Sequence, residues 1–320
     1  MRRGIRIAAA AAALVALVAT ARADTAPPPV QDWSIETVVV TAKKPGPAFW
    51  HVVSGKSEVW ILGTLGPVPE DLNWDTGRLE YLLQGAKVLL LPPRGQVGPL
   101  EGIWFLITSG DVLRQPDGTL LESTLPPPLK ARFVAMRNSL HKDSDDYSEY
   151  KASVAGFMLE RDFLRANDLN GAQPLKTIEG VAERATVPSR RVATYEALDV
   201  IKEVPSLSNT GNWACMKDSL DDIDVMAQHA RLAAQAWATG DLDGIKANYS
   251  DPKALDCLGQ SASFSKLWAR SVNDTLSAVN TALKTPGKTV AVVGIGELLR
   301  KNGLVDRLKA EGFAVEGPGD

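Results

Sequence analysis

The positions best suited to chemistry lie directly after two apolar runs. Two further candidates lie on a predicted helix between these runs. Thr64 and Gly66 follow the first run, and Glu297 follows the second. Arg270 and Asn273 lie three residues apart on the polar face of a predicted helix. Arginine binds carboxylates well, so this pair could hold a peptide terminus or an acidic ligand. The alternative is a buried structural ion pair, with Glu297 as its acid.

Glu297 opens a predicted helix, where the helix dipole favours a carboxylate over a cation. This position favours helix capping rather than metal binding. The turn Gly294-Ile295-Gly296 lacks the third glycine of a dinucleotide-binding fingerprint. The sequence contains no phosphate-binding loop, nucleophile elbow or H-E-x-x-H motif. Adjacent side chains diverge on a helix, so we expect Asp145-Asp146 and Asp221-Asp222 to be solvated surface pairs.

The histidines and cysteines predict no metal site. A catalytic zinc usually takes three protein ligands, but the histidines are only His51, His141 and His229. We expect surface or satisfied core roles for them, with His51 the one that could reach the strand ends. Cys215 and Cys257 have no cysteine or histidine at the short spacing of a metal site. An oxidising compartment favours a disulfide bond between them, and a reactive thiol is the alternative.

Residues 1–23 predict a secretory signal peptide. Arg2, Arg3 and Arg6 precede an apolar run, and Ala21-Arg22-Ala23 matches a cleavage site. The run is shorter than the roughly 20 residues of a membrane-spanning helix, and an uncleaved anchor is the alternative. We therefore expect a periplasmic or secreted protein with no membrane span after signal cleavage.

The composition after the signal excludes one class of partner. Removing the four arginines of the signal changes the formal charge from −3 to −7, so binding to nucleic acid would gain nothing from counterion release.

Residues 24–47 form a proline-containing lead-in. Within it, Glu36–Ala42 resembles the box by which outer-membrane receptors engage TonB, and an edge strand or a linker is the alternative reading. The sequence does not indicate the oligomeric state.

The remainder predicts one mixed α/β domain over residues 48–316. Short apolar runs bounded by turn residues predict strands, and apolar residues at helical spacing predict amphipathic helices. We expect strands at 58–62, 87–91, 176–178, 191–194, 289–293 and 313–315. We expect helices at 76–85, 125–140, 147–165, 215–237, 264–283 and 297–311, with the first two strands forming a parallel βαβ start.

Several short stretches, in this order and spacing, resemble the TraB/GumN family, which is related to the Tiki metalloproteases. They cover residues 48–52, 59–64, 237–241, 268–273, 290–294, 303–304 and 308–315. The resemblance implies a central sheet with parallel strands in two related halves, flanked by many helices. It also implies a divalent metal held at the strand ends by a G-T-x-H motif, an acid after the second strand and a G-x-x-H motif. An Arg-Asn pair, here Arg270 and Asn273, completes the implied site.

This chain departs from that pattern at the implied ligands. Gly66 stands at the first motif histidine, Pro92 at the acid and Glu297 at the second histidine. Glycine and proline side chains offer no ligand atom, so we predict a divergent member with no bound cofactor. Glu196 matches a family acid only loosely. Arg270, Asn273, Thr64 and Glu297 remain as the candidate ligand-binding residues.

Two functions are consistent with these residues. The first is an exported, non-catalytic protein that binds a peptide or a cell-envelope component in the degenerate active-site cleft. The alternative is a metal-dependent, peptidase-like hydrolase with a rebuilt site that uses Glu297, Arg270 and nearby acids. We expect Gly66 and Glu297 to face each other across one cleft, because both follow strands.

Overall fold

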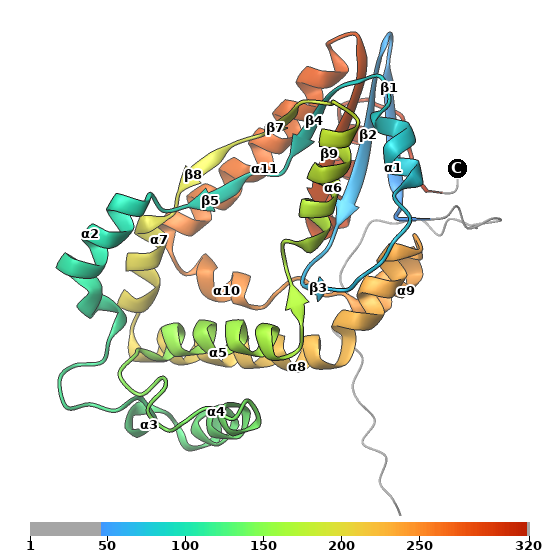
Figure 1. Ribbon diagram of the computed structural model, residues 1–320. Helices are drawn as coiled ribbons and strands as arrows, with labels where there is room; N and C mark the ends of the chain where they lie inside the picture. Colours follow the sequence, from blue (N-terminus) through green and yellow to red (C-terminus); the bar gives the residue numbers. More distant parts are fainter. Residues whose placement is uncertain (1–45, 319–320) are drawn as a thin grey trace, which may run out of the picture.

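The computed structural model describes residues 46–318. The predicted signal peptide and the Glu36–Ala42 segment lie outside the described residues, and the predicted lead-in enters them only at its last two positions. The mixed α/β fold is confirmed: within this range a mostly parallel central sheet is flanked by many helices (Figure 1).

The central sheet has six strands in the order β10-β1-β2-β9-β4-β7 within the described part of the chain. Strands β2, β9, β4 and β7 run parallel, whereas β1 pairs antiparallel with β2 and with β10. The strands are β1 (Phe49–Ser54), β2 (Ser57–Thr64), β4 (Ala86–Leu91), β7 (Ser189–Arg191), β9 (Gly287–Gly294) and β10 (Val315–Glu316).

Strand β9, from the C-terminal part of the described chain, lies in one sheet with strands from the N-terminal part. It lies between β2 and β4 and is parallel to both, so the predicted βαβ start is a split unit rather than an adjacent pair. Thr64, the last residue of β2, is in register with Gly294, the last residue of β9. The two apolar runs singled out in the sequence therefore end side by side.

Alternate residues of the strands face two different helical layers, as expected for a sheet buried on both faces. Val290 and Val292 pack with α1 (Gly77–Leu83) and α6 (Gln173–Arg184). Ala291 and Val293 pack with helices of the opposite layer. That layer comprises α9 (Leu242–Asn248), α11 (Ala262–Leu283), α12 (Ile295–Leu299), α13 (Leu304–Ala310) and the end of α8 (Asn209–Ala238).

A separate helical core lies below the sheet in Figure 1. It is built by α3 (Leu121–Thr124), α4 (Pro127–Ser139), α5 (Ala152–Ala166) and the first two-thirds of α8. Phe133 and Tyr147 pack edge to face at its centre, with ring centroids 5.9 Å apart. This core is distinct from the two that cover the sheet.

Helix α8 connects the helical core to the sheet. It begins at the N-cap Ser208, whose hydroxyl accepts the Gly211 N–H, and continues for 30 residues. At its far end the Trp237 indole donates to the carbonyl of Gly63 in β2 at 2.6 Å. Near its start, a disulfide bond between Cys215 and Cys257 ties it to α10 (Ala254–Gly259), which confirms the predicted pairing.

The remaining elements are short. Two small sheets pair β3 (Val68–Pro69) with β6 (Leu169–Asn170) and β5 (Arg94–Gln96) with β8 (Thr194–Glu196). The other helical segments are α2 (Pro99–Ser109), η1 (Gly110–Leu113), α7 (Leu198–Glu203) and η2 (Val204–Ser206). Over residues 46–318, none of the helices combines the length and the apolar character that crossing a bilayer requires.

Several secondary-structure predictions were wrong, and one strand was missed. The predicted strand 191–194 falls on the break between β7 and β8. Residues 176–178 belong to helix α6, because Ile178, Val181 and Ala182 form a buried stripe at helical spacing. The predicted helix 297–311 is two helices, α12 and α13, separated by a turn at Gly303. Strand β1 was not predicted as a separate strand, although the fold was expected to start at its first residues.

Candidate functional site

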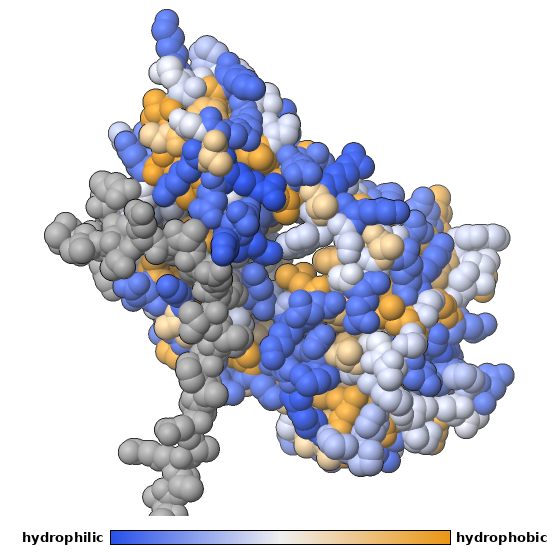
Figure 2. All heavy atoms as spheres, turned by 180° about the vertical axis from the view of Figure 1, so that it is seen from behind, coloured by the Kyte–Doolittle hydropathy of each residue, from blue (hydrophilic) through white to orange (hydrophobic). Residues whose placement is uncertain are grey.

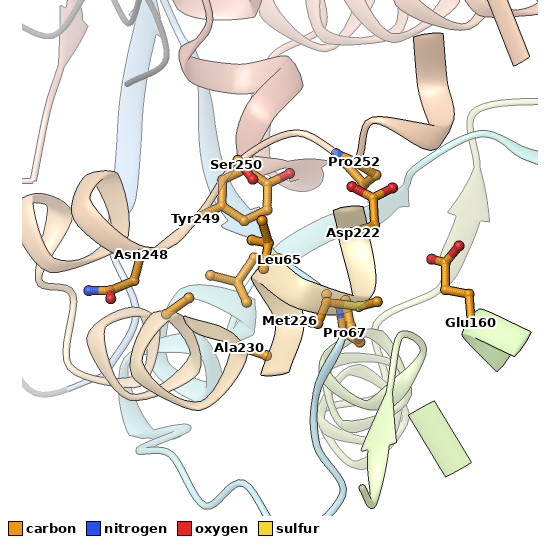
Figure 3. Close-up of a pocket in the computed structure, with 13 residues that line it drawn as sticks. Leu65, Pro67, Glu160, Asp222, Met226, Ala230, Asn248, Tyr249, Ser250 and Pro252 are labelled. Carbon is orange, nitrogen blue, oxygen red and sulfur yellow. The ribbon is translucent and has the colours of Figure 1, made fainter. Parts of the chain in front are cut away.

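A small cavity lies directly after the end of β2. Leu65, Gly66 and Pro67 form one wall, and residues of α5, α8 and the segment 248–252 form the others (Figure 3). Its volume is about 70 Å³. A water molecule needs roughly 10–15 Å³ on this measure, so the cavity holds a few waters or one small functional group. Gly66, a position singled out in the sequence, thus lines a real cavity.

Two carboxylates line this cavity from different helices. Glu160 comes from α5 and Asp222 from α8, and Figure 3 shows both at one end of the lining, with Asn248 at the other. Asp222 is 5% exposed and accepts the backbone N–H groups of Lys253 and Ala254, each at 2.8 Å. Among the described residues the lining contains no lysine or arginine. The cavity therefore has an acidic end.

Both carboxyl groups have a raised pKa, chiefly because they are buried. Burial, together with the nearby charge of Asp222, raises the pKa of Glu160 to about 7, although the Ser219 hydroxyl opposes the shift. Burial also raises the pKa of Asp222, but its two backbone donors favour the ionised form. Because Asp222 keeps these donors, Glu160 is the carboxylate that takes up a proton near neutral pH.

A hydrogen-bonded chain links the cavity to α12. Tyr249 lines the cavity and donates to Asp251 at 3.3 Å, and Asp251 pairs with Arg300 at 3.2 Å. The Arg300 Nε donates to the carbonyl of Gly296, and its guanidinium lies over the Trp268 ring. This network joins the segment 249–251 to α12 and α11.

Glu297 lies outside the cavity lining. Burial raises the pKa of its carboxyl, while the Thr275 hydroxyl and the charges of Arg300 and Arg307 oppose the shift. One carboxylate oxygen, Oε1, is buried without a hydrogen-bond partner. The strands that precede Gly66 and Glu297 end together, but Glu297 bonds to Thr275 of α11 and does not line the cavity. The two residues therefore do not face each other across this cavity, as the sequence had led us to expect.

Arg270 and Asn273 have different partners. Arg270 is largely exposed, pairs with Asp274 at 3.5 Å, and lies 5.2 Å above the Tyr195 ring, whose hydroxyl donates to Asp274 at 2.6 Å. Asn273 accepts from Arg307 at 3.3 Å. The alternative of a buried Arg270–Glu297 ion pair was therefore wrong, because a solvent-facing arginine is paired within its own helix. Whether the two residues bind a ligand stays a prediction.

The other candidate residues have structural contacts. The Thr64 hydroxyl donates to the Val293 carbonyl at 3.4 Å and thereby joins the ends of β2 and β9. Pro92 follows β4 and accepts from Arg191 through its carbonyl at 2.7 Å. Glu196 is exposed at the end of β8, 3.5 Å from Gln96. Neither Pro92 nor Glu196 lines the cavity.

The histidines lie apart from each other and outside the cavity lining. His51 stacks on Trp60 and bonds to Glu58 and Glu316 at the sheet edge. His229 bonds to Asn248 at 3.1 Å, and His141 is exposed. In the described part of the chain, no three His, Cys, Asp or Glu side chains are grouped so that they could hold a metal ion. The side chains present therefore do not fit the divalent metal that the resemblance implies.

The model of the TraB/PrgY/gumN family matches residues 48–317. The chain belongs to this family. No curated protein and no solved structure shows a significant match to the chain. The family model covers nearly all of the described residues.

Sequence reasoning missed two residues of the cavity in this TraB-family chain. Asp222 was expected on the surface, but it is buried, while its neighbour Asp221 pairs with Arg132 and Lys253. Glu160 was not considered. The spacing along α5 could have indicated this residue. Glu160 lies four residues after the buried Gly156 and next to the buried Leu159, so it is on the inward side of the helix.

Proposed function

We propose that this TraB-family protein is exported and non-catalytic, and that it binds a peptide or a cell-envelope component at the cavity beside Gly66. The single observation that carries the proposal is the acidic end of this cavity, formed by Glu160 and Asp222. Two carboxylates without a cation among the described lining residues suit a positively charged group. An amine is the group that such a ligand would insert.

The size of the cavity supports a small cationic group rather than a whole side chain. A volume of about 70 Å³ takes an ammonium and a few of its neighbouring atoms. Tyr249, Asn248 and Ser250 add polar groups to the same lining. The rest of the ligand would therefore lie outside the cavity, on the surface formed by the segment 248–252.

The alternative hydrolase gains less support from the geometry. Glu297 and Arg270, which it would use together, have different partners: Arg270 pairs with Asp274, whereas the Thr275 hydroxyl bonds to Glu297. The buried, unpartnered Oε1 of Glu297 is the one observation in its favour. Peptide hydrolysis by the purified protein that disappears in Glu297→Gln, but persists in Glu183→Gln, would establish the hydrolase instead.

The binding proposal predicts a dependence on both carboxylates. We expect Nα-acetyl-lysine amide to bind at pH 8, and Glu160→Gln or Asp222→Asn to weaken this binding at least tenfold, because each variant removes a charge-assisted contact. Isothermal titration calorimetry measures the affinities. Binding should also weaken from pH 8 to pH 6, because protonation of Glu160, with its pKa of about 7, removes one charge.

The matched control for this experiment is Glu183→Gln, which changes an exposed acid on α6 outside the cavity. It should bind like the unmodified protein. The amide of neutral norleucine, of similar shape, should not bind. Equal affinities of the unmodified protein and Glu160→Gln would contradict the proposed site. Circular dichroism of each variant separates this result from a loss of fold.

Export is proposed from the pattern of residues 1–23, and the buried disulfide bond agrees with an oxidising compartment. We expect the protein recovered from the periplasm or the medium of an expressing bacterium to begin at Asp24. Edman sequencing or intact mass measurement checks this. A recovered chain that retains Met1, or one found only in the cytoplasm, would contradict the proposal.

A further inference from the structure

A second and larger cavity is lined by α5 and α7. Its volume is about 490 Å³, within the usual range for small-molecule pockets, and it shares no lining residue with the cavity beside Gly66. Helix α5 contributes Val154, Phe157 and Met158, and α7 contributes Val200 and Ile201. Nearly all of the surface that these residues present is apolar.

The lining has one charged residue among those that the structure describes, and it is a cation. Arg161 is half exposed, and its Nε and Nη2 donate to Asp162 at 3.2 and 3.0 Å. Asp162 also binds Lys142 at 3.1 Å and Tyr147 at 2.8 Å. Two cations thus share the Asp162 carboxylate, and about half of the Arg161 side chain stays open to solvent at the cavity.

An exposed apolar surface lies beside the elements that line this cavity. Leu113 of the lining belongs to η1, which directly follows α2. Helix α2 exposes Leu100 (83%), Trp104 (68%) and Ile107 (74%) at the spacing of one helix face. It stands at the edge of the molecule next to α7 (Figure 1), and Figure 2 shows how hydrophobic residues interrupt the otherwise hydrophilic surface of the rear face.

We propose that the cavity lined by α5 and α7 binds the hydrocarbon chain of an anionic amphiphile, with its acidic headgroup at Arg161. This site is separate from the proposed amine site and does not depend on it. A long-chain carboxylate is the simplest ligand of this class.

The polar groups of the lining favour a hydrocarbon over a peptide. A bound peptide would bury amide groups, and each would need a hydrogen-bond partner. The lining offers few such partners: the Ser153 hydroxyl already donates to Asn212 at 2.6 Å, and Arg161 is the other polar side chain among the described lining residues. A hydrocarbon chain makes no such demand, and its one polar end matches the one cation.

The proposal predicts two independent dependences that calorimetry on the purified protein can measure below the micelle concentration. Affinity should rise about fourfold for each methylene added from decanoate to tetradecanoate, the value that corresponds to about 0.8 kcal/mol per buried methylene. Arg161→Gln should weaken binding of dodecanoate at least tenfold, while leaving binding of 1-dodecanol unchanged. Val154→Trp, which fills the cavity, should weaken both ligands.

The matched control is Arg165→Gln, which removes an exposed arginine one turn further along α5, outside the lining, and should leave both affinities unchanged. Failure of dodecanoate and tetradecanoate to bind saturably would overturn the proposal. So would an equal loss of dodecanoate affinity in Arg161→Gln and Arg165→Gln. A dimer in sedimentation experiments that Val154→Trp dissociates would assign the cavity to a second copy of the chain, and would also overturn it.

Discussion

Replacing Cys215 and Cys257 together by alanine is expected to lower the free energy of unfolding by about 4 kcal/mol. The bond joins residues separated by 42 positions, and closing a loop of this length restricts the unfolded chain by that order of free energy. Both cysteines are fully buried between α8 and α10, so lost packing adds to the effect. Urea unfolding followed by tryptophan fluorescence measures it.

The same experiment in the presence of a reductant provides the control. Reductant should destabilise the unmodified protein by a similar amount and leave the double-alanine variant unaffected. A difference of less than 1 kcal/mol between the oxidised protein and the variant would mean that the bond does not constrain the unfolded chain as expected. If the fold lacks the bond in its native compartment, free thiols would also be detected in the unreduced, denatured protein.

Glu160→Gln is expected to stabilise the protein at pH 8, by up to about 3 kcal/mol, the value that corresponds to the shift of the Glu160 pKa from 4.5 to about 7. The sign follows from proton binding. Between these two pKa values the folded state holds a proton that the unfolded state has lost, so the stability of the unmodified protein falls as pH rises through this window. Above pH 7 both states are ionised and the loss is complete.

Urea unfolding at pH 5, 6, 7 and 8 tests this expectation. The variant should lose most of the decline in stability between pH 5 and pH 7, whereas Glu183→Gln should keep it. A smaller slope should persist in the variant, because burial and neighbouring carboxylates also raise the pKa of Asp218, to about 6, and burial raises that of Asp222. If stability depends on pH equally in Glu160→Gln and in the unmodified protein, folding does not raise the pKa of Glu160.

The sequence was sufficient to predict the mixed α/β class and the central strands. The short apolar runs at 59–62 and 290–293 favour strands buried between two layers, and both belong to parallel strands of the sheet. Their order was not predictable. The insertion of β9 between β2 and β4 depends on contacts between residues about 200 positions apart, which no local pattern encodes.

The candidate site was predicted less well than the fold. Gly66, one of the family motif positions, lines the cavity, but the carboxylates of this cavity come from α5 and α8, far from every motif position. The expectation that Asp221-Asp222 is solvated used a sound premise, since adjacent side chains do diverge. The conclusion failed because the inward one, Asp222, has its charge satisfied by two backbone donors at the start of α10.

The length of α8 has a mechanical consequence. Its 30 residues make a rod of about 45 Å whose two ends are anchored, one by a covalent bond and one by the indole of Trp237 under β2. The anchored positions Cys215 and Trp237 are about 33 Å apart along the helix, so a tilt of about 5° at Cys215 would displace Trp237 by roughly 3 Å. The helix therefore couples the disulfide bond mechanically to the end of β2, because a rigid rod transmits a displacement from one anchored position to the other.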